Sequence, residues 1–242
     1  MSLDEKAWQD IRLRIVAAAK AARRDPGSIR VLAVSKSFPI QALQAAYAMG
    51  QRACGENYVQ EARPKIAALA GLPGIEWHLI GPLQGNKARA AAQSFSWVET
   101  IDRQEIAQRL SMARDVHSPP LNVCIQVNIS GETTKHGVIP SMALALAREV
   151  GRLPGLALRG FMGIAQAADD GVPVRAQFHL LRELYDAGRR EGFALDTLSM
   201  GMSSDLEFAI AEGATQLRIG SALFGPRGPA TRTRVDHSMT QR

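Results

Sequence analysis

Short apolar runs alternate with longer amphipathic stretches along almost the whole chain. The runs are rich in branched residues and carry few charges, which is typical of strands buried on both faces of a parallel sheet. Strands are predicted at residues 31–35, 52–55, 76–80, 97–101, 123–128, 157–164, 197–200 and 216–219. The stretches between them repeat apolar residues every three or four positions, which is typical of helices. Helices are predicted at residues 5–22, 40–49, 59–69, 87–94, 103–114, 141–152, 174–191 and 205–212.

This order of elements places the fold in the α/β class. Eight strands that alternate with helices predict a single (β/α)8 TIM barrel with an extra N-terminal helix. The alternative is an open, doubly wound sheet, which would carry a Gly-x-Gly-x-x-Gly sequence after its first strand, where Ser35-Lys36-Ser37-Phe38 stands here. We expect the barrel to span residues 1–225. The segment 226–242 is basic and rich in proline, glycine and threonine, and is expected to be a disordered tail.

Composition and charge narrow the class of protein. Hydrophobic residues make up 46% of the 242 residues and charged residues 21%, as in ordinary globular proteins. No apolar stretch approaches the ~20 residues that cross a membrane, and the first residues lack the apolar segment of a signal peptide. Cys54 and Cys124 lie far apart in predicted strands, which fits buried thiols in the reducing cytoplasm. The net charge of +6 comes without a nucleic-acid-binding motif, so an anionic small ligand is the expected partner.

Lys36 directly follows the first predicted strand. Active sites of (β/α)8 barrels lie at the carboxyl ends of the strands. A lysine that is partly desolvated at such a place can lose its proton and form a Schiff base with an aldehyde. Taken alone, Lys36 is better explained as a lysine that extends its ammonium group into solvent. The residues at the other strand ends favour the Schiff-base interpretation instead.

Glycine-containing loops follow the seventh and eighth predicted strands. In the first loop, Ser204 and Glu207 have the spacing of a capping box at the start of a helix, and unpaired backbone N–H groups there would attract an anion. In the second, Arg218 is followed by Gly220 and Ser221, which adds a cation, an open backbone and a hydroxyl. Many barrels bind phosphate with these two loops. The alternatives are plain helix capping by the serines and an ion pair of Arg218 inside the barrel.

A phosphate site opposite the lysine of the first strand predicts pyridoxal 5′-phosphate (PLP), since this cofactor carries both an aldehyde and a phosphate. If the guanidinium of Arg218 faces the pyridine nitrogen, that nitrogen stays unprotonated, because two adjacent positive charges repel each other. The ring would then be a weak electron sink. Such a site suits racemisation or simple carriage of the cofactor better than transamination.

Seven segments together resemble the pyridoxal-phosphate homeostasis proteins (the YggS/PROSC family), which are related to the barrel domain of alanine racemase. The matching segments are residues 31–36, 55–61, 77–87, 127–130, 159–162, 198–203 and 218–225. The resemblance implies that Lys36 is the Schiff-base lysine and that the segments of Ser203 and of Gly220-Ser221 hold the phosphate. The chain departs from the family pattern at Gly85 and in the segment 135–137. The second departure concerns the loop after the fifth strand.

Further residues near the expected rim complete the candidate site. Asn57 and Tyr58 follow the second strand and are expected to frame the ring, with helix capping by Asn57 as the equal alternative. His78 is expected inside the barrel, more as a hydrogen-bonded core histidine than as a ring contact, while Met162 and Met200 are expected to pack under the ring. The candidate cofactor-binding residues are Lys36, Asn57, His78, Met162, Ser199, Met200, Gly201, Ser203, Arg218, Gly220 and Ser221. No histidine or cysteine spacing indicates a metal site.

Two functions compete for this site. The preferred one is a monomeric, non-catalytic protein of PLP homeostasis that holds the cofactor on Lys36 and passes it to apo-enzymes. The alternative is a PLP-dependent amino-acid racemase of the alanine racemase type, which needs a second base on the opposite face of the ring. Alanine racemases add a β domain and a tyrosine base, and of the three tyrosines here Tyr47 and Tyr185 are expected in helices away from the rim. A lysine-dependent aldolase is disfavoured, because its lysine typically lies on a late strand.

Overall fold

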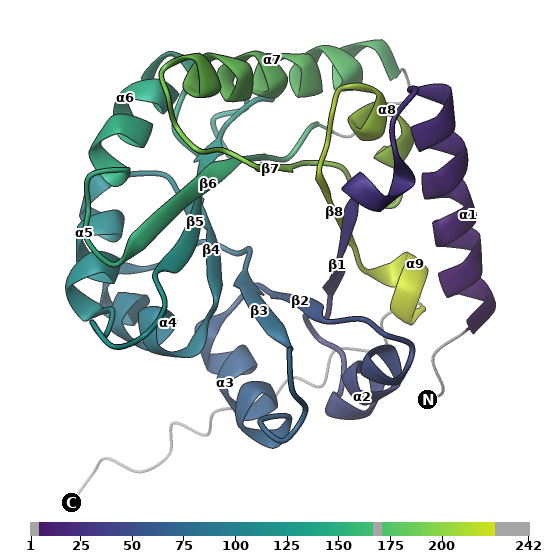
Figure 1. Ribbon diagram of the computed structural model, residues 1–242, viewed down its shortest axis with the longest axis horizontal. Coiled ribbons are helices and arrows are strands. Elements are labelled where there is room, and N and C mark those ends of the chain that lie inside the picture. Colours follow the sequence, from purple (N-terminus) through teal and green to yellow (C-terminus); the bar gives the residue numbers. More distant parts are fainter. Residues whose placement is uncertain (1–4, 167–170, 226–242) are drawn as a thin grey trace, which may run out of the picture.

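Eight parallel strands close into a barrel in strict sequence order, as Figure 1 shows. The structure is a computed structural model that describes residues 5–166 and 171–225. The strands are β1 (Arg30–Val34), β2 (Ala53–Glu56), β3 (Glu76–Leu79), β4 (Trp97–Ile101), β5 (Leu121–Val127), β6 (Leu156–Gly163), β7 (Thr197–Ser199) and β8 (Gln216–Ile219). The predicted (β/α)8 barrel is therefore confirmed, and the open sheet is excluded because β1 pairs with β8. The predicted tail, 226–242, lies outside the described residues.

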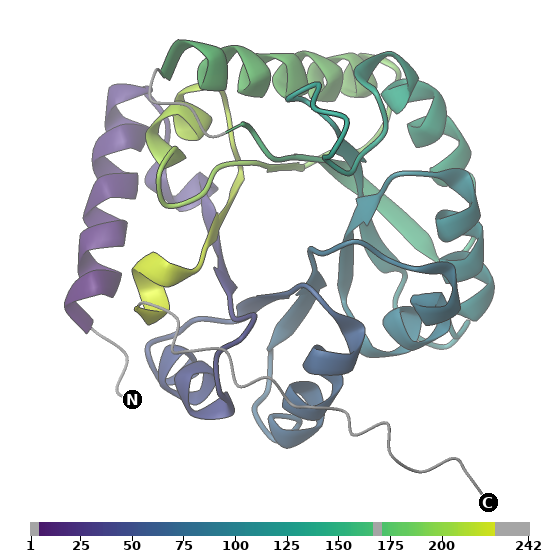
Figure 2. The ribbon, with the colours of Figure 1, turned by 180° about the vertical axis from the view of Figure 1, so that it is seen from behind.

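Helices surround the barrel on its outside in both views (Figures 1 and 2). They are α1 (Glu5–Ala21), α2 (Ile40–Ala48), α3 (Val59–Ala68), α4 (Ala88–Ser94), α5 (Gln104–Ala113), α6 (Pro140–Val150), α7 (Gly171–Arg190), α8 (Leu206–Ala211) and α9 (Ser221–Phe224). Two 3-10 turns, η1 (Pro26–Ser28) and η2 (Gly85–Lys87), precede β1 and α4. Most bounds agree with the sequence pattern to within two residues. None of the described helices is long and apolar enough to cross a membrane.

Side chains alternate along each strand between the helices and the barrel interior. The outward residues and the inner faces of the helices form the large apolar core, which includes Ala33, Cys54 and Leu198. The inward residues form a much smaller apolar cluster of Trp97, Cys124 and Met162. Leu32 is also buried inside the barrel, next to Arg218 in the register of β1 and β8. Beside these apolar residues lie several polar side chains, which is unusual for a barrel normally filled by branched apolar residues.

The extra helix α1 covers the barrel beside α8 and α9, where the closing helices are short (Figure 1). Trp8, Ile11 and Ile15 are buried at the spacing that one helical face requires. At the outer edge Arg14 forms a bidentate ion pair with Glu207 of α8, with distances of 2.8 and 2.9 Å. The predicted N-terminal helix thus completes the outer layer of the barrel.

Gly81 brings the segments after β2 and β3 into direct backbone contact. A Cβ atom at position 81 would lie 2.1 Å from the carbonyl oxygen of Asn57. No side chain fits at that distance, so an added methyl group must push the two segments apart. The position of Asn57 at the rim therefore depends on a glycine that follows β3.

We expect Gly81→Ala to lower the free energy of unfolding by about 2–3 kcal/mol, since the methyl group overlaps fixed backbone. Gly71→Ala is the matched control, because a Cβ there has nothing within 4 Å, and it should stay within about 1 kcal/mol of wild type. Urea unfolding of both variants measures the difference. Equal stability of the two variants would show that the segments can separate at no cost.

Candidate functional site

Lys36 lies in a tight turn directly after β1. The turn is closed by a hydrogen bond from the N–H of Phe38 to the carbonyl of Ser35, at 3.0 Å. Ser37 has a φ of 64°, a conformation that costs a residue with a side chain about 1 kcal/mol or more. The Lys36 side chain is half-buried. The structure thus places the candidate lysine at the carboxyl end of a barrel strand, as predicted, on a constrained segment of backbone.

The loops after β7 and β8 present unoccupied donors at the same end of the barrel. Ser203 is half-buried and Ser221 exposed. Apart from bonds within a helix, the hydroxyl and backbone N–H groups of these two serines donate no hydrogen bond to another described residue. The following segment α9 starts at Ser221, so its first N–H groups lack intrahelical partners. Donors of this kind can bind the oxygens of an anion.

The predicted capping box of Ser204 and Glu207 is wrong. Helix α8 begins at Leu206, and Asp205 stands at the N-cap without a side-chain capping bond. Its carboxylate instead accepts a hydrogen bond from the N–H of Met202 and so fixes the loop. Glu207 is bound by Arg14 on the other side of the helix. The loop is therefore held from within by Asp205, and Ser204 is exposed.

Arg218 lies inside the barrel near the ends of β6, β7 and β8. Its Nη1 donates to the carbonyl of Ser199 at 2.7 Å and to the Ser199 hydroxyl at 2.9 Å, and its Nη2 donates to the carbonyl of Gly163 at 2.7 Å. Only 5% of the residue is exposed. The predicted alternative, an ion pair inside the barrel, is not formed among the described residues. Three hydrogen bonds instead hold the guanidinium across the top of the interior.

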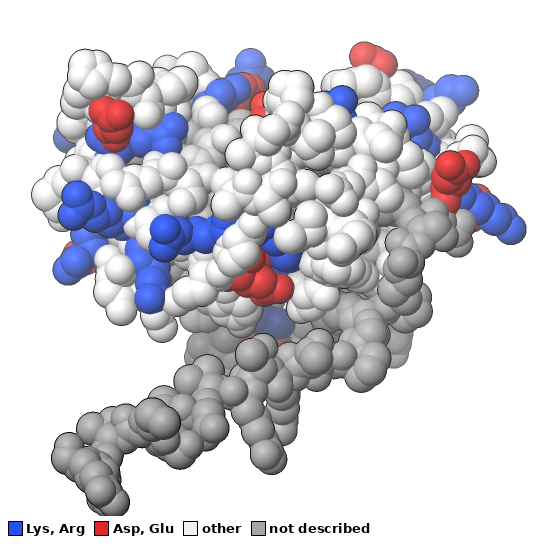
Figure 3. Space-filling model, turned by 90° about the horizontal axis from the view of Figure 1, so that it is seen from below, with Lys and Arg blue, Asp and Glu red and all other residues white. Residues whose placement is uncertain are grey.

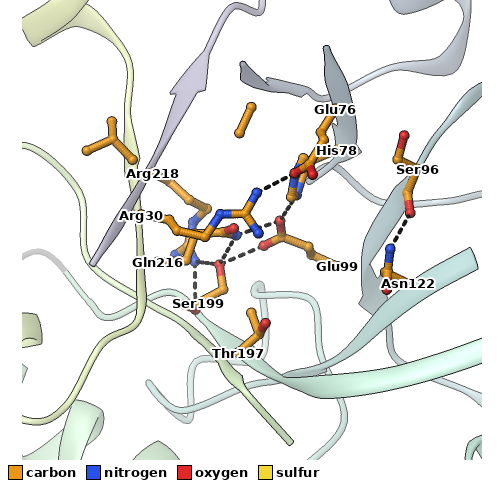
Figure 4. A network of polar contacts seen from close by, with 12 residues as sticks. Arg30, Glu76, His78, Ser96, Glu99, Asn122, Thr197, Ser199, Gln216 and Arg218 are labelled. Atoms are coloured by element: carbon orange, nitrogen blue, oxygen red, sulfur yellow. Dashed lines mark hydrogen bonds and ion pairs between the residues drawn. The ribbon is translucent and has the colours of Figure 1, made fainter. Parts of the chain in front are cut away.

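A buried carboxylate organises the polar side of the interior (Figure 4). Glu99 of β4 has no exposed surface and accepts hydrogen bonds from the Ser199 hydroxyl at 2.6 Å and from Gln216 at 2.7 Å. The Nδ1 atom of His78 lies 2.6 Å from Glu99 Oε1, and it must donate, because an ionised carboxylate only accepts. The chain of contacts thus runs from His78 through Glu99 and Ser199 to Arg218.

These contacts decide the charge of Glu99. Burial alone would raise its pKa, but the hydrogen bonds from His78 and Ser199 and the charge of Arg218 hold the pKa below its usual value. Burial lowers the pKa of Arg218, against the attraction of Glu99. Both groups therefore stay charged inside the barrel, joined through the Ser199 hydroxyl and not by a direct ion pair. Removing one of two such buried charges is costly, because the other charge is then left uncompensated.

His78 is a buried histidine of the interior, as the favoured alternative expects, but only its Nδ1 is hydrogen-bonded and its Nε2 has no hydrogen-bond partner among the described residues. Its ring stacks on Trp97 with a centroid distance of 5.0 Å. Its Nε2 lies 3.7 Å from Glu76, which forms an ion pair with Arg30 at the far end of the barrel. His78 therefore reaches Arg218 only through Glu99 and Ser199. Any effect of His78 on a bound ring would pass through these residues.

The structure separates the two predicted methionines. Met162 packs in the barrel interior with Trp97 and Cys124, so its expected place under a ring stays a prediction. Met200 is fully buried in the outer core between strands and helices, which corrects its expected place under the ring. Gly201 follows it with a φ of 93°, and a Cβ there would lie 2.5 Å from Ala209. Packing against α8 is thus sufficient reason for glycine at this position.

Asn57 lines a cavity of about 150 Å³ at the carboxyl end of the strands. The cavity also contacts Gly81, Gln126, Asn128 and Ile164. The helix-capping alternative for Asn57 is wrong, because Tyr58 holds the N-cap of α3 and has no capping bond. Tyr58 itself is 57% exposed. Of the predicted pair, only Asn57 lines this cavity.

The surplus positive charge lies largely on the outside of the barrel. Figure 3 shows the side that is lowest in Figure 1, where Lys and Arg side chains gather toward α4. A groove between α3 and α4 is lined by Arg63 and Lys87, and a groove between α4 and α5 by Arg89 and Arg109. Neither lining includes an acidic residue. The net charge is therefore no guide to the strand-end site.

Several residues of the site were missed from the sequence. Glu99 could have been found from the sequence, since an acidic residue in the middle of an apolar strand needs a buried partner. Lys65 gave no such signal, because its spacing from Glu61 is that of an ordinary surface pair on a helix. Its ammonium is nevertheless buried against Glu56, at 2.8 Å. Among the described residues, no cluster of three or more metal-ligating side chains is present.

Both the sequence and the barrel of this chain match known proteins. Residues 11–228 match the family model of the alanine racemase N-terminal domain. The chain is 52% identical over 217 residues to a pyridoxal phosphate homeostasis protein of Pseudomonas aeruginosa, covering 90% of this chain and 93% of the other. It is 47% identical over 222 residues to the protein of that name in Escherichia coli K12, covering 90% and 94%.

Solved structures agree with these matches. PipY of Synechococcus elongatus, with PLP bound, aligns with a TM-score of 0.76 and 37% identity, covering 87% of this chain and 100% of that one. An alanine racemase of Clostridium difficile aligns with a TM-score of 0.68 at 13% identity, covering 92% of this chain and 58% of that one, which shows a common fold.

Fold and family model together define an alanine-racemase-type barrel. The two relatives narrow the assignment within this class, because the match covers nearly their whole length. The chain belongs to the pyridoxal phosphate homeostasis protein family.

We expect Glu99→Gln to lower the free energy of unfolding at pH 7 by about 2–4 kcal/mol, because Arg218 and His78 lose a buried anion. The folded pKa of Glu99 is depressed. Its ionised form therefore adds stability that is fully present above the unfolded pKa of about 4.3 and is lost as the pH falls through the folded pKa. The gap between wild type and variant should narrow below that pH.

Urea unfolding at pH 7 and at pH 3 measures this gap. Glu105→Gln is the control, since Glu105 is exposed and has no hydrogen bond or ion pair with the rest of the described chain. A gap that is the same at both pH values would mean that the pKa of Glu99 does not differ between the folded and the unfolded protein.

Proposed function

We propose that the chain binds PLP covalently through Lys36 and takes part in the homeostasis of this cofactor in the cytoplasm. The observation that supports this most directly is the position of Lys36 on a constrained turn at the carboxyl end of β1. The loops after β7 and β8, with their unpaired donors, end at the same rim. The family membership and the PLP-bound structure of PipY point to the same ligand.

The residues present fit the chemical groups of PLP. Its aldehyde condenses with an amine and loses one water as the C=N bond forms, and Lys36 supplies that amine. We assign the phosphate to the donors of Ser203, Gly220 and Ser221, which have no acceptor in the described protein beyond the helices. These groups are uncharged, so they bind the phosphate through hydrogen bonds from the N–H and hydroxyl groups.

We assign the ring nitrogen to the side of the site that Arg218 closes. Its guanidinium stays protonated, because arginine keeps its proton in proteins. It is held in place by Ser199 and Gly163, so it cannot follow a ligand outward. A fixed cation opposes protonation of a neighbouring nitrogen. Asn57 and Met162 are assigned to the edge and the underside of the ring, and Gly201 to the loop that leads to Ser203.

A carrier fits this chain better than a racemase. Racemisation needs a second base that faces the ring opposite the lysine. Tyr47 donates its hydroxyl to the carbonyl of Pro73, and Tyr185 donates to the carbonyl of Leu195 inside the helical layer. Burial also raises the pKa of Tyr185, which makes it a weaker acid at neutral pH. Tyr58 is the remaining tyrosine, and it is largely exposed.

Borohydride reduction of the wild-type protein with PLP is expected to label Lys36, seen as a peptide adduct by mass spectrometry. The complex should absorb near ~420 nm, which is a property of the bound cofactor. Lys36→Ala should remove both signals, while Lys87→Ala, on the outside of the barrel, should leave them unchanged. A stable adduct on another lysine in place of Lys36 would disprove the assignment.

Turnover separates the carrier from the racemase. We expect the PLP-loaded protein to form D-amino acids from L-amino acids far more slowly than ~1 s⁻¹, the low end of ordinary enzymes. Chiral chromatography measures this. We also expect it to transfer PLP to an apo-enzyme faster than it releases PLP into buffer. Turnover above that rate would favour the racemase, and transfer no faster than free release would reduce the protein to a passive buffer of PLP.

A further inference from the structure

The residues on both sides of Lys36 are bound by a charged cluster behind the barrel wall. The cluster consists of Glu56 at the end of β2 and of Glu61 and Lys65 on α3. Lys65 Nζ lies 2.8 Å from Glu56 Oε1 and 3.8 Å from Glu61 Oε1. Side-chain exposure is 0% for Glu56 and 9% for Lys65. A charged pair this deeply buried needs a structural reason, because its desolvation costs several kcal/mol.

The first contact of this cluster is with Ser35, the residue before Lys36. The Ser35 hydroxyl donates to Glu56 Oε1 at 2.6 Å, and Lys65 Nζ donates to the Ser35 carbonyl at 2.9 Å. The N–H of Ser35 donates to the carbonyl of Gly55 at 2.9 Å, in continuation of the sheet. Every polar group of Ser35 is therefore fixed.

The second contact is with Ser37, the residue after Lys36. Its backbone N–H donates to Glu61 Oε1 at 2.7 Å. Ser37 has a φ of 64°. A non-glycine residue adopts this left-handed conformation only when surrounding interactions offset its cost. A hydrogen bond to a carboxylate is stronger than one to a neutral acceptor. Glu61 thus stabilises the strained half of the turn, and the Glu56–Lys65 pair stabilises the other half.

The burial of Glu56 also indicates that the Glu56–Lys65 pair has a structural role. Burial raises the pKa of Glu56, while the charge and hydrogen bond of Lys65 oppose the rise. Glu56 Oε2 has no hydrogen-bond partner within the described residues. The pair thus retains an incomplete hydrogen-bond set although it is buried, and such a cost is tolerated at functional positions.

We propose that Glu61, together with the buried Glu56–Lys65 pair, is a clamp that positions Lys36 for covalent bond formation with PLP. The inference rests on the proposed attachment of PLP to Lys36. These three are positioning residues, since they contact the backbone on either side of Lys36 and act through it. A turn held at both ends limits the directions in which the amine can extend, and preorganisation of this kind favours bond formation without adding contacts to the ligand.

Glu61 is the member of the clamp that can be tested without unfolding the protein, because its side chain is 33% exposed. Glu61→Ala removes the acceptor of the Ser37 N–H, whereas Glu61→Gln keeps an oxygen in its place. Glu105→Ala is the matched control, since Glu105 also lies in the first turn of a helix and is exposed. Urea unfolding of each apo-protein verifies that the fold is intact.

The readouts are borohydride labelling of Lys36 at fixed times after addition of PLP and the affinity for PLP by fluorescence titration. We expect Glu61→Ala to reduce the labelling rate and the affinity by about three- to tenfold, the effect of losing one hydrogen bond. Glu61→Gln should stay within about twofold of wild type, and Glu105→Ala should match wild type.

The same titration in a Lys36→Ala background completes a double-mutant cycle, which isolates the coupling between Glu61 and Lys36. The clamp predicts that Glu61→Ala then no longer weakens the remaining non-covalent binding. An equal loss in both backgrounds would overturn the inference, because Glu61 would act on the site without Lys36. Wild-type labelling of Lys36 with unchanged labelling in Glu61→Ala would overturn the clamp alone. Absence of Lys36 labelling in wild type would overturn the proposed function and the clamp with it.

Discussion

The buried carboxylate of Glu99 is the charge on which the interior of the barrel depends. It is fully enclosed, and three side chains donate hydrogen bonds to it. Because Ser199 donates to Glu99, its remaining oxygen lone pair and its carbonyl are free to accept from Arg218. The position of a cation at the mouth of the barrel thus follows from an anion deep inside it. Polar side chains thus occupy part of an interior that apolar residues fill in most barrels of this type.

A buried ion pair of Glu56 and Lys65 lies on the other side of the barrel wall. Glu56 of β2 points toward α3, which carries Lys65, while Glu99 and Arg218 point into the interior. Strand alternation places the three strand residues, Glu56, Glu99 and Arg218, because it sends neighbouring residues to opposite sides of the wall. Both sets of charges act on a strand end: one fixes Arg218 on β8, the other the turn after β1. The rim is therefore supported from inside and outside by buried charges. Such charges are weak as sources of stability but strict in the geometry they accept.

Much of the fold could be predicted from the sequence, because the apolar period and the strand-end glycines are local signals. The strand-end position of Lys36 followed from the same pattern. The error at Ser204 has a physical reason, since the capping-box spacing cannot reveal that Asp205 would bond to Met202 and that Arg14 would claim Glu207. Met200 was misplaced because β7 ends at Ser199, so the alternation that puts Ser199 inside turns Met200 outward. Lys65 could not be found, because burial of a helical lysine depends on which helix face meets the barrel.

The central claim is that PLP bridges Lys36 and the loops after β7 and β8, with its ring nitrogen toward Arg218. A crystal structure of the protein grown with PLP tests this directly. The account predicts continuous density between the amine of Lys36 and the ring, with the phosphate on the N–H groups near Ser203 and Ser221 and the Ser35–Phe38 turn unchanged. Density for PLP on another lysine, or a phosphate away from both loops, would contradict the account.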